Sequence, residues 1–321
     1  MKSIQELQIV VENELTGLSY PESPADLYAP IDYVLTLGGK RMRPILLLLA
    51  HQLFDENIAH AIKPALGIEI FHNFTLLHDD IMDDAPLRRG QQTVHEKWNP
   101  NVAILSGDTM LVQAYQMIAE TPANVLKKAL DVFIQTATEV CEGQQYDMYF
   151  EMRDDVAISE YIKMIEYKTA VLLAGSLKIG ALTGGATEDE ANHLYEFGRN
   201  IGIAFQLKDD LLDVFGDQDK FGKQVGGDIL ANKKTYLYLK SLSDAEGAQK
   251  ENLEHWFSSK EFEATEKVRA VKSIYSELHI EEQTTAQMQA YYGVAMRHLS
   301  QISGDKRYLE QFASMLMVRE S

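Results

Sequence analysis

Two groups of aspartates are the residues of this chain whose types and spacing most clearly indicate chemistry. Each group places acids at positions i, i+1 and i+4, within LLHDDIMDDA and FQLKDDLLDVF. The residues are Asp79, Asp80 and Asp83, and Asp209, Asp210 and Asp213. On a helix, positions i and i+4 lie one turn apart on one face, so two carboxylates can reach one ion. Oxygen ligands without cysteine favour Mg²⁺, which keeps waters and shares its shell with substrate phosphates.

Both aspartate boxes are predicted to lie in the last turns of helices, because Pro86 follows the first and Gly216 follows the second. Carboxylates are disfavoured there by the negative end of the helix dipole, and like charges at i, i+4 repel each other. A solvated acidic helix end would explain one box. Two boxes with the same spacing favour a pair of metal sites.

Basic residues gather around these boxes although the chain is acidic, with 30 Lys+Arg against 48 Asp+Glu and a net charge of −18. They occur in GGKRMRP, PLRRG, EYKTA, FGKQVGGD and ANKKT. The residues are Lys40, Arg41, Arg43, Arg88, Arg89, Lys168, Lys223, Lys233 and Lys234. Arginine binds phosphate bidentately, lysine supplies a point charge, and paired glycines allow backbone to approach an anion.

Carboxylate metal sites beside these cations predict a diphosphate substrate that carries its own metal. No GxxxxGK[ST] or GxGxxG motif occurs, so nucleotide binding has no motif support. The acidity disfavours nucleic acid and anionic lipid as partners. One cysteine, Cys141, cannot form an internal disulfide and indicates a reducing compartment. The first residues lack a signal-peptide pattern and TAVLLAGSL is only about half a membrane span, so we expect a cytoplasmic protein without a membrane span.

The elements that must position these residues are predicted to be helices. Apolar residues in 2–16 recur at helical spacing, and no stretch alternates cleanly with period two. Asn99-Pro100 and Thr121-Pro122 are typical of helix starts, and Thr187 with Glu190 predicts a capping box that opens a helix to about Asp213. Few glycines and prolines and no linker predict a single all-α domain over residues 1–321.

These motifs, in this order, resemble the trans-isoprenyl diphosphate synthases of the polyprenyl synthetase family, which includes farnesyl and geranylgeranyl diphosphate synthases. The resemblance covers roughly residues 38–235, and residues 236–321 carry no recognised motif. It implies an all-helical fold around a deep central cavity, usually a homodimer. It also implies a prenyltransferase that condenses isopentenyl diphosphate with dimethylallyl, geranyl or farnesyl diphosphate.

The resemblance also implies roles for individual residues. The six box aspartates would bind Mg²⁺, three ions in all, with the allylic diphosphate, and Asp79 and Asp209 would take part in catalysis. The same diphosphate would contact Arg88, Lys168, Lys223 and Lys233. The diphosphate of isopentenyl diphosphate would contact Gly39, Lys40, Arg43, His72 and Arg89. Thr169 and Gln206 would present oxygen dipoles to the allylic cation, and Gln144 and Asp147 would line the cavity.

Product length is predicted from the helix that carries the first box. Phe74 and Phe71 precede Asp79 by about 7.5 and 12 Å along a helix. Either ring can form the floor of the product cavity, although an ordinary core phenylalanine would look the same in sequence. In the family, a bulky residue at the Phe74 position beside Thr75 resembles producers of C15 to C20 chains.

Three alternatives remain at this stage. Glu69-x-x-His72 and Glu190-x-x-His193 have the spacing of a di-iron carboxylate bundle, but that reading leaves the aspartate boxes unexplained. A class I terpene cyclase shares the fold and first box but has no use for a second, metal-free diphosphate site. A non-catalytic subunit of a heteromeric synthase typically loses a box, whereas this chain keeps both.

Overall fold

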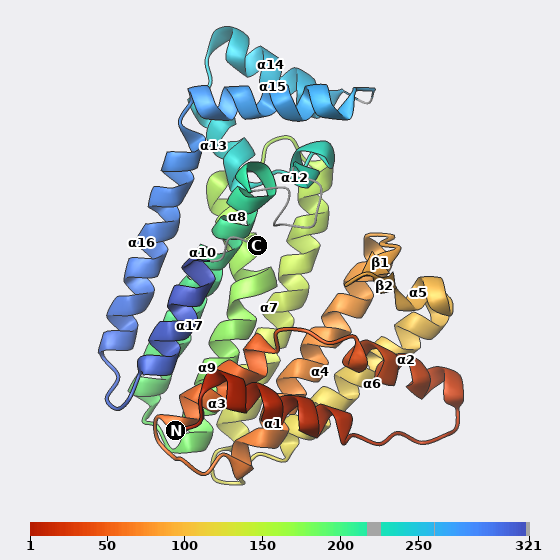
Figure 1. The fold of residues 1–321 in the computed structure, drawn as a ribbon, viewed down its shortest axis with the longest axis vertical. Helices are drawn as coiled ribbons and strands as arrows, with labels where there is room; N and C mark the ends of the chain where they lie inside the picture. Colours follow the sequence, from red (N-terminus) through yellow and green to blue (C-terminus); the bar gives the residue numbers. More distant parts are fainter. Residues whose placement is uncertain (217–225, 260, 319–321) are drawn as a thin grey trace. The chain divides into compact units, whose positions relative to one another are not determined.

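The computed structural model describes residues 1–216, 226–259 and 261–318, almost all of them helical or in short turns (Figure 1). The first part of the chain forms α1 (Ile4–Thr16), α2 (Ala25–Thr36), α3 (Met42–Gln52), α4 (Ala59–Met82), α5 (Val94–Lys97) and α6 (Pro100–Ala119). Between α4 and α5, β1 (Leu87–Arg88) and β2 (Gln91–Gln92) pair as an antiparallel hairpin. The all-α fold predicted from sequence is confirmed.

The rest of the chain continues with α7 (Leu126–Met152), α8 (Ile158–Ile165), the π-helical turn η1 (Glu166–Ala170), α9 (Val171–Gly184) and α10 (Glu188–Phe215). The last elements are α12 (Gly227–Leu230), α13 (Tyr236–Asp244), α14 (Gly247–Ser258), α15 (Ala264–Glu277), α16 (Ile280–Ser300) and α17 (Arg307–Val318). Among the described residues, no helix has both the length and the apolar character needed to cross a bilayer.

The chain divides into two compact units. Unit 1 comprises residues 1–134, 175–194 and 303–309, and unit 2 comprises 135–174, 195–302 and 310–321. Each unit carries one aspartate box. Whether the two units make one domain, as we expect from the absence of a linker, stays a prediction.

Close helix packing supports the first box in unit 1, where α4 packs against α6 and α3 (Figure 1). A Cβ on Gly67 would lie 3.0 Å from the Ala114 carbonyl oxygen, and one on Gly107 would lie 2.2 Å from His78 Nε2. The first contact would force a neighbour to shift by a few tenths of an ångström, and the second is shorter than real Cβ atoms show. These two glycines therefore let α4 and α6 approach closely enough to hold the box-bearing helix in place.

Most predicted helix ends agree with the structure, and one does not. Asn99 caps α6 through the Val102 N–H, and Thr187 and Glu190 form the predicted capping box of α10, which ends at Phe215. The prediction of a helix start at Pro122 was wrong, because α7 begins at Leu126. The Pro122 carbonyl accepts from both the Val125 and Leu126 N–H groups, so the chain makes a turn before the helix.

Candidate active site

The first aspartate box closes α4 in unit 1. The Asp83 N–H donates to the Asp79 carbonyl at 2.8 Å and so ends the helix, as predicted. Asp80 is 4% exposed, and both of its oxygens accept from Arg88 Nε at 2.8 Å. Arg88 lies on the β1–β2 hairpin just after the helix. The hairpin thus brings a cation directly to the box and partly neutralises its buried carboxylate.

Arg89, the next residue on the hairpin, contacts the glycine pair at 38–39 instead of the aspartate box. Its guanidinium donates to the Gly38 carbonyl, and a Cβ on Gly39 would lie 2.9 Å from Arg89 Nη2. Gly39 has φ +145°, a backbone conformation that side chains rarely adopt. The glycine pair therefore leaves both the room and the backbone freedom that Arg89 needs beside the 38–41 loop.

A positively charged cluster forms where this loop meets α4. Arg43 Nη1 lies 3.0 Å from His72 Nε2. Burial lowers the pKa of His72 well below its usual value, and the guanidiniums of Arg43, Arg89, Arg88 and Arg41 lower it further. A neutral His72 accepts from Arg43, so the positive charge of the cluster lies on its guanidiniums. The structure thus brings Gly39, Arg43, His72 and Arg89 together, whereas Lys40 has an exposed side chain at the edge of the loop.

We expect His72→Gln to reduce the acid sensitivity of the fold. The pKa of His72 is depressed in the folded protein from a reference of 6.5. Below pH 6.5 the unfolded chain binds a proton at this histidine that the folded chain does not bind. The contribution of His72 to the free energy of unfolding is therefore complete above pH 6.5. It falls by about 1.4 kcal/mol for each pH unit below that value. Urea unfolding at pH 7.5 and pH 5.5 would measure it, with the exposed His279→Gln as control. An unchanged pH slope in His72→Gln would contradict the prediction.

Arg41 differs from its neighbours because its buried side chain forms ion pairs. It is 3% exposed and donates to Glu69 at 2.7 Å and to Glu12 at 3.0 Å. Glu69 also accepts from Asn73 Nδ2 at 3.0 Å. Glu69 is therefore used in a buried ion pair, and Glu190 is used in the capping box of α10. These contacts give the di-iron alternative no support.

The second aspartate box lies in unit 2, near the end of α10. Asp210 is 3% exposed, accepts from the Tyr161 hydroxyl at 2.5 Å and from Gln206 Nε2 at 3.2 Å. Burial, and then the nearby Asp228 carboxylate, raise the pKa of Asp210 to about 7. Asp213 accepts from the backbone N–H of Asp228 at 3.0 Å. In both boxes the middle aspartate is the buried one and has a dedicated partner.

The EYKTA motif forms the π-helical turn η1. Lys168 Nζ lies 2.5 Å from Asp147 Oδ2, and Thr169 Oγ1 lies 3.3 Å from Gln206 Oε1. A Cβ on Gly143 of α7 would lie 2.3 Å from the Lys168 backbone nitrogen, and one on Gly202 would lie 2.5 Å from Ala170 Cα. Two glycines from α7 and α10 thus accommodate the widened turn. Single π turns inside helices occur frequently at functional sites.

A small cavity of about 190 Å³ opens beside this turn within unit 2. Its lining includes predicted residues from α7, η1, α10 and the segment between α12 and α13, namely Asp147, Lys168, Thr169, Gln206, Asp210 and Lys233. It also includes Lys234, one of the basic residues of the ANKKT motif, and Tyr161, Asp228 and Asn232, which no motif predicts. Lys233 Nζ lies 3.8 Å from Asp228 Oδ1. Lys223, which we expected here, lies outside the described residues.

Comparison with known proteins matches this arrangement to a family. The sequence model of the polyprenyl synthetase family matches residues 24–277. The chain belongs to this family. It is 44% identical over 230 residues to the geranylgeranyl diphosphate synthase of Methanosarcina mazei, covering 71% of this chain and 70% of the relative. It is 41% identical over 248 residues to the geranylfarnesyl diphosphate synthase of Natronomonas pharaonis, covering 71% and 73%.

A crystal structure of a geranylgeranyl pyrophosphate synthase superposes with a TM-score of 0.94 and 42% sequence identity over all of both chains. This polyprenyl synthetase is thus an isoprenyl diphosphate synthase, a prenyltransferase of the short-chain class, as its motifs predict. The cyclase and the silent-subunit alternatives have no support from these relatives.

The packing around η1 gives a prediction for this prenyltransferase. We expect Gly143→Ala to lower turnover on the order of 10–100-fold, because its methyl group would displace the backbone that carries Lys168 and Thr169. Gly293→Ala is a matched control, since its Cβ would meet only Arg297 Nη1 at 3.7 Å. Steady-state kinetics with circular dichroism would compare the two. Equal turnover in both variants would show that the close contact does not position Lys168.

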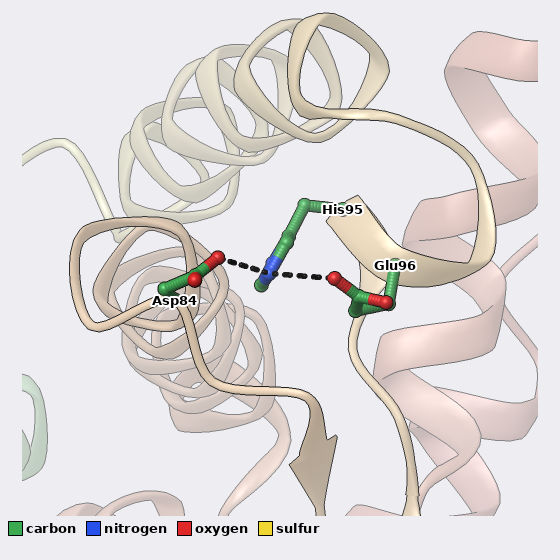
Figure 2. A group of neighbouring side chains, drawn as sticks. All are labelled: Asp84, His95 and Glu96. Atoms are coloured by element: carbon green, nitrogen blue, oxygen red, sulfur yellow. Dashed lines mark ion pairs between the residues drawn. The ribbon is translucent and has the colours of Figure 1, made fainter.

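One cluster of metal-ligating residues was missed in the sequence. Among the described residues, the three-residue group whose ligand atoms all lie within 4.8 Å of one another is Asp84, His95 and Glu96, drawn in Figure 2. The predicted boxes do not form such a group by themselves, because Asp80 faces Arg88 and Asp210 faces Tyr161. Asp84 directly follows the first box, and no spacing rule links it to His95 on α5.

Proposed function

We propose that this enzyme condenses isopentenyl diphosphate with allylic diphosphates and that its main product is the C20 compound geranylgeranyl diphosphate. The observation that carries the proposal is the division of the hairpin arginines. Arg88 pairs with the first aspartate box, whereas Arg89 joins the cluster of Arg43, His72 and the 38–41 loop. Two anion sites of different character, one at the carboxylates of the first box and one at a group of guanidiniums beside a neutral histidine, suit two diphosphate substrates.

The six box aspartates would hold Mg²⁺ with the allylic diphosphate, as expected for oxygen ligands beside bound phosphate. The donor set fits, because each box supplies only carboxylates. Bound Mg²⁺ would stabilise the negative charge of the leaving diphosphate. Three ions per site is our proposal for the number.

The chain's own residues would do the remaining work. Arg88, Lys168 and Lys233, with Lys223 outside the described residues, would bind the allylic diphosphate electrostatically. Asp147 holds the Lys168 ammonium in place. Thr169 and Gln206 would turn oxygen dipoles toward the allylic cation. An apolar cavity would exclude water, which would otherwise quench the cation.

The isopentenyl diphosphate would bind Gly39, Lys40, Arg43, His72 and Arg89. Its double bond would attack the allylic cation, and the new bond leaves a tertiary cation that loses a proton. The departing diphosphate would accept that proton. A neutral His72 that accepts from Arg43 orients the guanidinium without adding charge of its own.

The product assay tests the proposal directly. Purified protein with Mg²⁺ and labelled isopentenyl diphosphate would be given C5, C10 and C15 allylic primers separately, and chain length would be read after dephosphorylation. We expect C20 product from all three primers and none with EDTA. The geranylfarnesyl diphosphate synthase relative makes C25 the main competing outcome. No incorporation from any primer would overturn the proposal.

We also propose that two copies form a homodimer. Ile104, Leu105 and Val112 on α6 are 43%, 59% and 67% exposed, an unusual set for one helix of an acidic chain. An apolar face of this kind suits a second copy of the same chain. Light scattering of the parent and of Val112→Glu would measure the assembly, and a monomeric parent would contradict it.

A further inference from the structure

We propose that Asp84, His95 and Glu96 bind one first-row transition-metal ion, with Zn²⁺ favoured, at a site separate from the two aspartate boxes. Figure 2 shows the His95 ring between the two carboxylates. His95 Nε2 lies 4.0 Å from Asp84 Oδ1 and 3.8 Å from Glu96 Oε1. Zn–N and Zn–O bonds are about 2.0–2.2 Å, so one ion can span each of these separations.

The histidine is the observation that sets this cluster apart from an ordinary group of acids. His95 is 8% exposed, and neither of its ring nitrogens has a hydrogen-bond partner within the described part of the chain. A buried polar group without a partner is destabilising, because it has lost its hydrogen bonds to water and gained none in the protein. A metal ion on Nε2 would satisfy a nitrogen that faces two carboxylates.

The ligand types select the ion. An imidazole nitrogen suits Zn²⁺ and its neighbours in the first transition row, whereas Mg²⁺ and Ca²⁺ prefer oxygen ligands alone. The Asp84 side chain is 97% exposed and that of Glu96 48% exposed, so both can rotate toward an ion held by the buried His95. Water would complete the coordination from the open side.

A metal ion at this position would affect the β1–β2 hairpin. Asp84 precedes the β1–β2 hairpin and His95 follows it. The Thr93 hydroxyl donates to the Ala85 carbonyl at 2.8 Å, so one hydrogen bond already links the two ends of the hairpin. A bound ion would cross-link both ends of the segment that carries Arg88 and Arg89. The ion would thus stiffen the hairpin. The existence of the site does not depend on the proposed function.

Calorimetric titration of Zn²⁺ into the full chain tests the site. Excess Mg²⁺ would occupy the aspartate boxes, and a Cys141→Ser background would remove the exposed thiol. We expect one Zn²⁺ site in the parent, and we expect its affinity to fall at least about tenfold in His95→Gln and in Glu96→Gln. Loss of a residue that only supports a metal ligand already lowers metal affinity by about 10–100-fold, so loss of a ligand should do at least as much. His279→Gln is the matched control, because this exposed histidine faces Glu282 at 3.7 Å.

Two further readings make the outcome decisive. Glu96→Gln alters a half-exposed side chain, so it decides the question if His95→Gln fails to fold. Hydrogen exchange in residues 85–93 should slow on Zn²⁺ addition in the parent and not in Glu96→Gln. No Zn²⁺ binding in excess Mg²⁺, or equal binding in the parent and both variants, would overturn the proposal. Neither result bears on prenyl transfer, which the Mg²⁺-dependent product assay tests alone.

Discussion

Asp210→Asn should abolish most prenyl transfer while leaving the protein folded. If Asp210 is a metal ligand, its loss removes charge stabilisation from the leaving diphosphate, and single interactions of this kind are worth about 10²–10³ in turnover. The fold should tolerate the change, because the pKa of Asp210 is already raised to about 7 and the site accepts a neutral side chain near neutral pH. Steady-state turnover at saturating Mg²⁺ would measure the effect.

Two controls separate metal binding from structure in this experiment. Tyr161→Phe removes the 2.5 Å hydrogen bond to Asp210 but keeps the carboxylate, so we expect a much smaller loss. Asp131→Asn changes an exposed acid of α7 whose partner is Lys127, and we expect no effect. If Tyr161→Phe and Asp210→Asn lose the same activity, the carboxylate acts through the hydrogen bond and the metal role is wrong.

Phe74→Ala should lengthen the product from C20 to C25 or beyond. Phe74 is 7% exposed, and its ring lies 5.6 Å from that of Phe71 and 4.7 Å from that of His78. Ile70, one turn further along the same face of α4, lines a cavity of about 440 Å³. Phe74 therefore lies along α4 between Asp79 and an existing space. Its removal would let the growing chain continue in that direction.

The same substitution also weakens the core, so its control must create an equivalent cavity elsewhere. Phe→Ala changes in a core destabilise by about 3–5 kcal/mol. Phe197 is fully buried in unit 2 and gives a matched Phe197→Ala variant. Chromatography of dephosphorylated products would compare the two with the milder Phe74→Leu. C20 product from both Phe74 variants would show that Phe74 is only a core residue.

Much of the site could be predicted because it depends on local spacing. The boxes end their helices as expected, since Asp83 closes α4 and α10 ends at Phe215. The 38–41 glycine loop, Arg43, His72 and Arg89 also come together. Pro122 shows the limit of this reasoning, because a proline fits the first turn of a helix and an isolated turn equally well.

Local spacing could not predict the contacts between segments that are distant in the sequence. Tyr161 has no motif of its own, yet the packing within unit 2 brings its hydroxyl to Asp210. The π turn of EYKTA depends on Gly143 and Gly202, which lie on two other helices. Residue spacing within one helix does not predict which residues of other helices will pack against it.

The sequence by itself determined the family and the helical class, because each follows from residue identity and from periodicity along one element. Only the tertiary structure decided how those side chains are paired. It assigned Arg88 to Asp80 and Arg89 to the glycine loop, although the two arginines are neighbours in sequence. It also buried His95 between two carboxylates. The physical reason is that burial and electrostatic pairing are set by distances in space, and these depend on packing between elements.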